Sequence, residues 1–260
     1  GTGSGGLTHL LWEIIDNGVD EAAAGHAKMV EVIFHPDGSY EVTDDGRGIP
    51  IEVKDGNITA LEIVFTELHA GGKFGNGAYG ASGGLHGVGA SVVNALSSRM
   101  VVEVDRKSAT HCLAFKEQAA GQVGSSGRFV PGHSLRKTGK VPSGRTGTRV
   151  RFWPDKDIFD PDAEINYEEV RERLGQICFL VPGLKIRLVD KRKGSKRPSE
   201  EFVSKGGLAD YVDFLSGENT SVTGLVRVQG VGEFLEKVPV DGKLTEVTSC
   251  LLYTSPSPRD

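Results

Sequence analysis

The sequence predicts an α+β protein in which helices pack on a mixed, mainly antiparallel sheet. Helical and strand-like patterns follow one another irregularly along the 260 residues, without the strict alternation of a doubly wound parallel sheet. Hydrophobic residues make up 38% and charged residues 25%, which excludes a disordered or fibrous chain. At roughly 100 to 200 residues per domain, this length predicts one large domain and part of a second.

Periodicity and turn residues place the individual elements. Apolar residues spaced i, i+3, i+4 from Leu7 to Val19 predict a helix that ends at Gly25. β-rich runs at 29–35 and 39–43 predict an antiparallel hairpin. Further helices are expected around 61–68, from within 85–90 to about 97, and at 167–180, and further strands at 100–105, 110–116, 148–153 and 184–190.

The last quarter of the chain predicts the start of a second domain. A charged stretch at 191–199 is expected to be a hairpin tip or a linker, and a helix at 207–215 and a strand at 222–229 come after it. We therefore expect a first domain over 1–203, a truncated second domain over 204–250 and an atypical tail over 251–260, whose prolines prevent regular structure. Because the chain has no initiator Met, its true N-terminus is expected upstream.

Charge and cysteine content narrow the class of protein. The 30 Lys+Arg against 35 Asp+Glu give a net charge of −5, which is no general footprint for binding a DNA duplex. Cys112, Cys178 and Cys250 are far apart and form no CxxC pair, so neither a zinc site nor a disulfide framework is expected. No apolar run approaches the ~18 residues of a membrane span. The sequence thus predicts a cytoplasmic protein without a membrane partner.

The first predicted helix carries a polar stripe. His9, Glu13, Asn17 and Glu21 recur every four residues, so their side chains lie along one edge. A solvated helix face is the plainest interpretation of the spacing alone. However, Asn is a poor helix former, its carbonyl oxygen suits Mg²⁺, and a Glu one turn away is placed to hold a water for attack.

A loop at 44–50 combines an acid with glycines and apolar side chains. Asp44 ends a predicted strand, Gly46 and Gly48 let a flat ligand approach the backbone, and Ile49 and Pro50 offer apolar cover. This composition suits a purine, whose exocyclic amino group can donate to the carboxylate. Asp-Gly and Gly-Ile-Pro are also turn sequences, so a simple tight turn remains an alternative.

The segment 71–89 contains nine glycines in 19 residues. Such a segment predicts a lid that becomes ordered on a ligand, with a disordered linker as the alternative. Its last part, Gly-Leu-His-Gly-Val-Gly at 84–89, leads into a predicted helix, whose N-terminal N–H groups suit a phosphate. Lys73 adds a positive charge.

Taken in order, these segments resemble the GHKL ATPase superfamily. Two longer runs, Leu-His-Ala-Gly-Gly-Lys-Phe at 68–74 and Ser-Gly-Gly-Leu-His-Gly-Val-Gly-Ala-Ser-Val-Val-Asn-Ala-Leu at 82–96, are similar to the ATPase subunits of bacterial type II topoisomerases, DNA gyrase and topoisomerase IV. The resemblance extends from about residue 7 to about 242. It implies a GHKL (Bergerat) ATP-binding sandwich over the first domain, followed by the start of a transducer (ribosomal S5-like) domain.

The resemblance also implies a role for individual residues. Glu13 matches the general base that polarises the attacking water, Asn17 the Mg²⁺ ligand and Asp44 the carboxylate that binds adenine. Thr148 matches a hydroxyl that supports Asp44. Glu21 and Arg47 match a pair at the mouth of the pocket, where coumarin-type inhibitors bind in this family. The full set expected around ATP is Asn17, Glu21, Asp44, Arg47, Gly48, Ile49, Pro50, Lys73, Thr148 and the lid residues Gly84, Leu85, His86, Gly87, Val88 and Gly89.

At the level of the whole enzyme, the resemblance implies ATP-driven closure of two copies of this chain. The two closed copies form a gate, which hydrolysis reopens as one DNA duplex passes through another. The second duplex is cleaved by a separate protein, gyrase A or its topoisomerase IV counterpart. By the same resemblance, the N-terminal arm of such relatives and the transducer lysine that reaches the γ-phosphate are expected to be missing from this sequence. The fragment is therefore expected to bind ATP weakly and to hydrolyse it slowly, if at all.

Two other functions stay open from the sequence. One is another GHKL ATPase, such as a histidine kinase, a mismatch-repair ATPase or an Hsp90-type chaperone. The other is a binding module without turnover, in which a basic run contacts DNA. That run consists of Lys191, Arg192, Lys193, Lys196 and Arg197.

Overall fold

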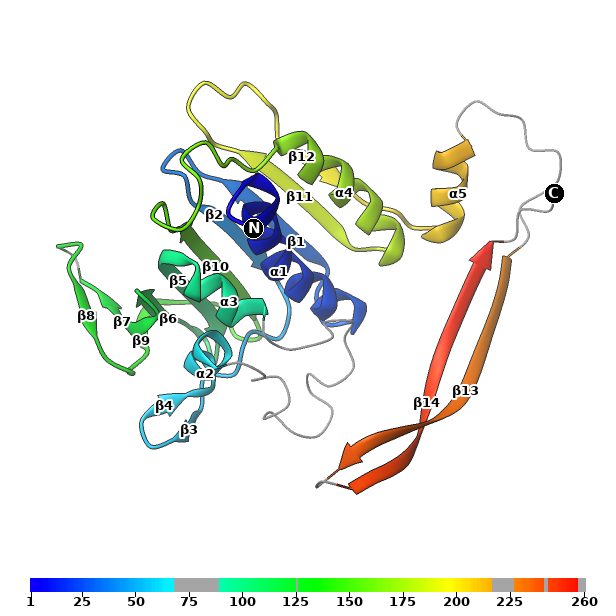
Figure 1. The fold of residues 1–260 in the computed structure, drawn as a ribbon, viewed down its shortest axis with the longest axis horizontal. Helices are drawn as coiled ribbons and strands as arrows, with labels where there is room; N and C mark the ends of the chain where they lie inside the picture. The colour runs from blue at the N-terminus through cyan, green and yellow to red at the C-terminus, as the bar shows by residue number, and fades with distance from the viewer. Residues whose placement is uncertain (68–88, 125, 217–226, 241–242, 257–260) are drawn as a thin grey trace.

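The protein is described by a computed structural model over residues 1–67, 89–124, 126–216, 227–240 and 243–256 (Figure 1). Side chains are described up to residue 216, apart from Asp55. Helices and a large, mainly antiparallel sheet form two layers, which confirms the predicted fold class. No helix in these ranges is both long and apolar enough to cross a membrane.

One 10-stranded sheet organises the molecule, in the order β12-β11-β1-β2-β10-β5-β6-β7-β8, with β9 paired to β6. Only the β1–β11 pair is parallel. The strands of this sheet are β1 (Met29–Phe34), β2 (Tyr40–Asp44), β5 (Ser97–Arg106), β6 (Ala109–Lys116), β7 (Ala119–Val123), β8 (Phe129–Pro131), β9 (Arg136–Lys140), β10 (Gly147–Pro154), β11 (Lys185–Asp190) and β12 (Glu200–Phe202). Two separate hairpins pair β3 (Val53–Asp55) with β4 (Ile58–Thr59) and β13 (Arg227–Val240) with β14 (Lys243–Pro256).

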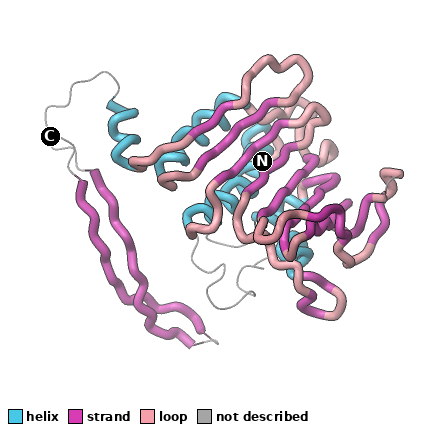
Figure 2. Tube along the Cα trace, turned by 180° about the vertical axis from the view of Figure 1, so that it is seen from behind, coloured by secondary structure: helices cyan, strands magenta, loops and turns pink. Residues whose placement is uncertain are grey.

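Helices cover one face of the large sheet. They are α1 (Ser4–Ala23), α2 (Ala60–Thr66), α3 (Gly89–Ala95) and α4 (Tyr167–Leu180), while α5 (Leu208–Ser216) lies beside α4 and off the sheet. In Figure 1, α1, α3 and α4 lie in front of the sheet, and the view from behind shows its strands bare (Figure 2). The core lies between the two layers, where Leu11, Phe34 and Leu174 are completely buried.

The uncovered face of the sheet carries charged side chains. Arg149 on β10 pairs with Glu103 on β5 at 2.5 Å, and Arg187 on β11 pairs with Glu31 on β1 at 3.3 Å. Exposed ion pairs add little stability individually. Because these charged side chains lie on one face and the core residues on the other, the strands have one polar and one apolar side. This is usual for an antiparallel sheet with one face in water.

Several predicted elements are found with small shifts in their ends. The first helix begins at Ser4, three residues before Leu7, and α4 occupies 167–180 as predicted. The third helix ends at Ala95, because Ser97 already belongs to β5. Its start was predicted within 85–90, and of these residues only 89 and 90 are described, both in α3. The stretch 191–199 joins antiparallel β11 and β12, so it is a hairpin tip rather than a linker.

The prediction for the last ten residues was wrong over 251–256. This segment pairs with β13 as part of β14, and Pro256 lies opposite Arg227. A two-stranded ribbon leaves one edge of each strand without a partner, so a proline at the strand end removes no required hydrogen bond. The division into domains at 203 and 250 stays a prediction.

Candidate functional site

The site is centred on Asp44, the last residue of β2. Asp44 lies opposite Val30 of β1 and Thr148 of β10, so it stands in the middle of the sheet. Its Oδ1 accepts a hydrogen bond from the Gly46 N–H at 2.9 Å. The Thr148 backbone N–H also donates to this carboxylate, which can still accept from a ligand because a carboxylate accepts several hydrogen bonds.

Burial determines the protonation of this carboxyl. Desolvation raises the pKa of Asp44 to about 6, against the hydrogen bond from Gly46, and the negative charges of Glu21 and Asp45 add to the increase. Near neutral pH the group is therefore mostly ionised but poorly solvated. A donor that replaces the lost water is favoured at this position.

Two glycines bring the backbone close to Asp44. Gly18 on α1 packs so tightly that an added Cβ would lie 3.1 Å from Val30 Cγ2 and 3.5 Å from Asp44 Cβ. At Gly46, an added Cβ would lie 2.8 Å from both Asp44 Oδ1 and Glu21 Oε2. Without side chains at these positions, the polar edge of α1 lies directly beside the end of β2.

Glu21 and Arg47 form a fixed pair next to Asp44. The guanidinium of Arg47 donates to Glu21 Oε1 at 2.6 Å and to Oε2 at 3.2 Å, and the Arg47 backbone N–H donates to Oε2 at 3.1 Å. Burial opposes ionisation of Glu21, yet these hydrogen bonds and the charge of Arg47 outweigh it and lower the pKa of Glu21. The paired carboxylate therefore stays negative beside Asp44.

Thr148 and the loop 48–50 form the opposite wall. The Thr148 hydroxyl accepts a hydrogen bond from the Ile49 N–H at 3.3 Å, which ties the loop to β10. Gly48 has φ +74°, a left-handed conformation that favours glycine. Ile49 packs against the core and Pro50 is half-buried, so both present apolar surface near Asp44. The expected support of Asp44 by the Thr148 hydroxyl stays a prediction.

Glu13 and Asn17 lie one turn apart on α1 and are both exposed. Neither side chain is hydrogen bonded to another residue within the described part of the chain. The first residue of α3, Gly89, lies against Glu13, because any side chain at 89 would collide with the Glu13 carboxylate. The start of α3 and the polar edge of α1 thus meet at one place.

The other predicted lid residues, Lys73, Gly84, Leu85, His86, Gly87 and Val88, lie outside the described residues. Both flanks of this segment are described. Asn94 of α3 donates to the Phe65 carbonyl of α2 at 2.8 Å. This bond holds together the two helices that lie on either side of the segment in the chain.

Asp45 has a structural role that was not predicted from the sequence. Its Oδ1 accepts hydrogen bonds from the Lys28 N–H at 2.7 Å and the Met29 N–H at 2.9 Å, so it fixes the start of β1. The distinction between the two neighbouring acids depends on strand pairing between distant segments. The role of Gly18 was missed for the same reason.

The basic run at 191–197 is partly neutralised within the hairpin. The carboxylate of Asp190, which is completely buried, pairs with Arg192 at 2.9 Å and with Arg197 at 3.3 Å. Two of the five cations therefore serve the fold, which weakens the alternative of a DNA-binding module based on this run.

Sequence and structure comparisons agree on one family. A sequence profile described as "Histidine kinase-, DNA gyrase B-, and HSP90-like ATPase" matches residues 3–158. The DNA gyrase B protein of Halalkalibacterium halodurans is 44% identical over 216 residues, which are 83% of this chain and 32% of that protein. The DNA gyrase B protein of Haloferax volcanii is 42% identical over 224 residues, 85% of this chain and 33% of that protein.

A solved structure has the same fold. The 43K ATPase domain of Thermus thermophilus gyrase B, in complex with an aminocoumarin, superposes with a TM-score of 0.71 at 36% sequence identity. The match covers 90% of this chain and 58% of that one. The chain spans about a third of the length of the curated relatives that it matches.

The buried charge at Asp44 gives a testable effect on stability. A carboxyl whose pKa is raised by folding destabilises the folded state as the pH rises from about 4 to 6. We expect Asp44→Asn to have the same free energy of unfolding as wild type near pH 3.5 and to be more stable at pH 8, by up to about 3 kcal/mol. Urea unfolding at both pH values measures this difference. An Asp44→Asn protein that is less stable at pH 8 would contradict the assignment.

Proposed function

Since the chain belongs to the histidine kinase-, DNA gyrase B- and HSP90-like ATPase family, we propose that it binds and hydrolyses ATP as part of a type II topoisomerase. The observation that carries this proposal is the half-buried, poorly solvated carboxylate of Asp44 at the end of β2, between an apolar loop and α1. The similarity to gyrase B proteins favours a topoisomerase over the other branches of the family.

Recognition of adenine rests on Asp44. The exocyclic amino group of adenine donates to the carboxylate, and Ile49 and Pro50 cover the ring. A hydrogen bond to an ionised group contributes about 1.5–3 kcal/mol. In the free protein the Asp44 carboxylate has lost hydrogen bonds to water. The adenine amino group replaces one of these hydrogen bonds, so its binding at this position is favoured.

The triphosphate lies along the polar edge of α1, toward Gly89. Gly89 begins α3 beside Glu13, and we expect the backbone N–H groups at this helix start to bind phosphate oxygens. The residue set fits a magnesium ion: the exposed Asn17 amide oxygen is a hard ligand, and the phosphates supply others. When bound there, Mg²⁺ would offset phosphate charge. Lys73 and residues 84–88 are proposed to complete the phosphate site.

Glu13 is the proposed general base. Its carboxylate is exposed one turn from Asn17 and next to Gly89, so it faces the end of the site where the γ-phosphate is expected. There it accepts a proton from the attacking water. A positioned base of this kind contributes roughly 10² to 10⁴ in rate.

The Glu21–Arg47 pair closes the outer end of the site. Glu21 fixes the guanidinium of Arg47, and about a third of the Arg47 side chain is exposed. The Thermus thermophilus relative was solved with an aminocoumarin. We propose that such an inhibitor binds here, at Arg47, in this protein.

The partners of the whole enzyme are also proposals. They are a second copy of this chain, the DNA-cleaving protein of the topoisomerase and duplex DNA. ATP would favour a closed dimer if the closed state binds it better, because a ligand shifts the equilibrium toward the state that it binds better.

Calorimetry with a non-hydrolysable ATP analogue tests the site. Asp44→Ala should weaken binding by about 10- to 100-fold, because the adenine amino group loses its charged acceptor. Asn17→Ala should lose only the part of the affinity that depends on Mg²⁺ and should match wild type in EDTA.

Asp45→Asn is the matched control, because the amide oxygen still accepts from Lys28 and Met29 and the residue lies outside the proposed site. It should bind as wild type does. Wild-type affinity in both Asp44→Ala and Asn17→Ala would show that the nucleotide binds elsewhere.

Glu13→Gln separates binding from hydrolysis. The amide keeps the size of the side chain but accepts no proton from water, so kcat should fall by roughly 10²- to 10⁴-fold with little change in analogue affinity. Asp16→Asn, on the same helix, should retain wild-type turnover. If Glu13→Gln keeps more than a tenth of wild-type kcat, another residue is the base.

A further inference from the structure

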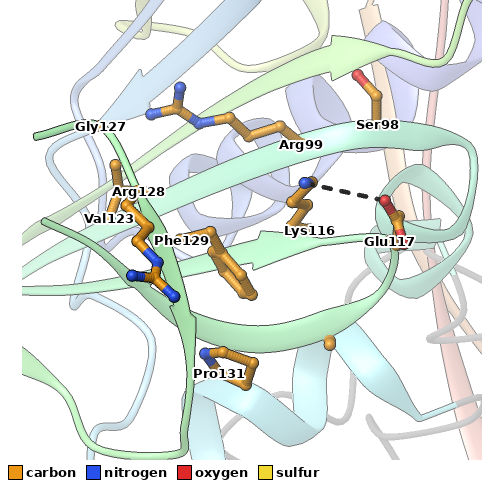
Figure 3. Close-up of a pocket in the computed structure, with 10 residues that line it drawn as sticks. Ser98, Arg99, Lys116, Glu117, Val123, Gly127, Arg128, Phe129 and Pro131 are labelled. Carbon is orange, nitrogen blue, oxygen red and sulfur yellow. Dashed lines mark ion pairs between the residues drawn. The ribbon is translucent and has the colours of Figure 1, made fainter.

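A second pocket lies on the other side of the sheet from Asp44. It has a volume of about 660 Å³ and is formed by β5, β6 and the β7–β8 hairpin (Figure 3). Arg99 and Lys116 on its floor are direct cross-strand partners. Since their neighbours Met100 and Phe115 are completely buried toward the helices, Arg99 and Lys116 point to the uncovered face. The pocket and the proposed ATP site share no residue.

The pocket has an excess of positive charge. Arg99, Lys116 and Arg128 line it, against one carboxylate, Glu117. The Lys116–Glu117 pair measures 4.0 Å, and 56% of the Lys116 side chain and 82% of the Glu117 side chain are exposed, so the two groups neutralise each other only weakly. The Arg128 side chain forms no hydrogen bond or ion pair within the described ranges. An anion entering the pocket thus meets available donors.

Arg99 is oriented without using its hydrogen-bond donors. Its guanidinium lies over the Trp153 ring, 4.6 Å from the centroid. Stacking of this kind leaves the N–H groups in the guanidinium plane free. A phosphate suits such donors, because Arg binds its oxygens in a bidentate manner.

One wall of the pocket is aromatic, and a glycine makes room for it. Phe129 lies among the charged side chains in Figure 3, with Pro131 beside it. A Cβ on Gly121 of β7 would lie 2.5 Å from Phe129 Cζ and 2.8 Å from Cε2, so the ring can occupy this place only because residue 121 has no side chain. The half-buried ring is a surface on which a planar group can stack.

We propose that this pocket binds a phosphorylated nucleoside, with the phosphate on Arg99, Lys116 and Arg128 and the base on Phe129. The volume suits one small molecule or one nucleotide unit. Free mononucleotides and the phosphorylated end of a single strand share this chemistry. The proposal does not depend on ATP binding at Asp44.

Calorimetry with uridine 5′-monophosphate tests the proposal. The Asp44→Asn variant serves as the parent protein, so that binding at the proposed adenine site is weakened. Binding should be saturable, should weaken as salt is raised, and should fall at least tenfold in Lys116→Gln/Arg128→Gln. Lys140→Gln, an exposed cation on β9 outside the pocket, is the charge control and should bind as the parent does. Circular dichroism confirms that the variants fold.

Phe129→Ala distinguishes a nucleotide site from a general anion site. It should reduce the affinity for uridine 5′-monophosphate by roughly tenfold while leaving that for inorganic phosphate unchanged. If a 5′-phosphorylated tetrathymidylate binds more than tenfold tighter than the mononucleotide, the ligand is the end of a single strand. If the two affinities are equal, the ligand is a free nucleotide. No saturable binding, or equal binding by parent and Lys116→Gln/Arg128→Gln, would overturn the proposal.

Discussion

The burial of the Asp44 carboxylate is the constraint on which the rest of the site depends. Asp44 ends the central strand β2 between β1 and β10, and α1 packs above it closely enough that residue 18 has to be small. The protein thereby keeps a poorly solvated carboxylate whose pKa is raised to about 6. The folded protein would be more stable if this charge were exposed to water. Loss of stability at a binding site is a common consequence of function.

The neighbouring groups follow from that constraint. The hydrogen bonds and charge of Arg47 lower the pKa of Glu21 despite its burial, so Glu21 stays ionised and its negative charge adds to the raised pKa of Asp44. The bond from Ile49 to Thr148 fixes the apolar loop on β10, and α1 carries Glu13 and Asn17 along the same edge. One helix thus connects the proposed adenine end of the site with the proposed phosphate end, and its packing on the sheet sets the distance between them.

Much of this could be predicted from the sequence, because local periodicity determines α1, α4 and the β1–β2 hairpin. The short strands β7, β8, β9 and β12 were missed, since they depend on pairing with segments already in the sheet. Resemblance to a known family predicted Asp44 as the acid that binds adenine, and this stays a prediction, whereas the structural role of Asp45 is seen only in its contacts with the start of β1. The pocket at Phe129 had no local signal, because Arg99, Lys116 and Arg128 come from three segments.

The ionisation of Asp44 itself tests this account most directly. Carbon-detected NMR can follow the Asp44 carboxyl between pH 3 and 9, with and without a non-hydrolysable ATP analogue. We predict a pKa of about 6 in the free protein and a decrease of at least one unit with the analogue, because a donor to the ionised form favours it. A carboxyl that titrates near pH 4 in the free protein and does not shift when the analogue binds would contradict the account.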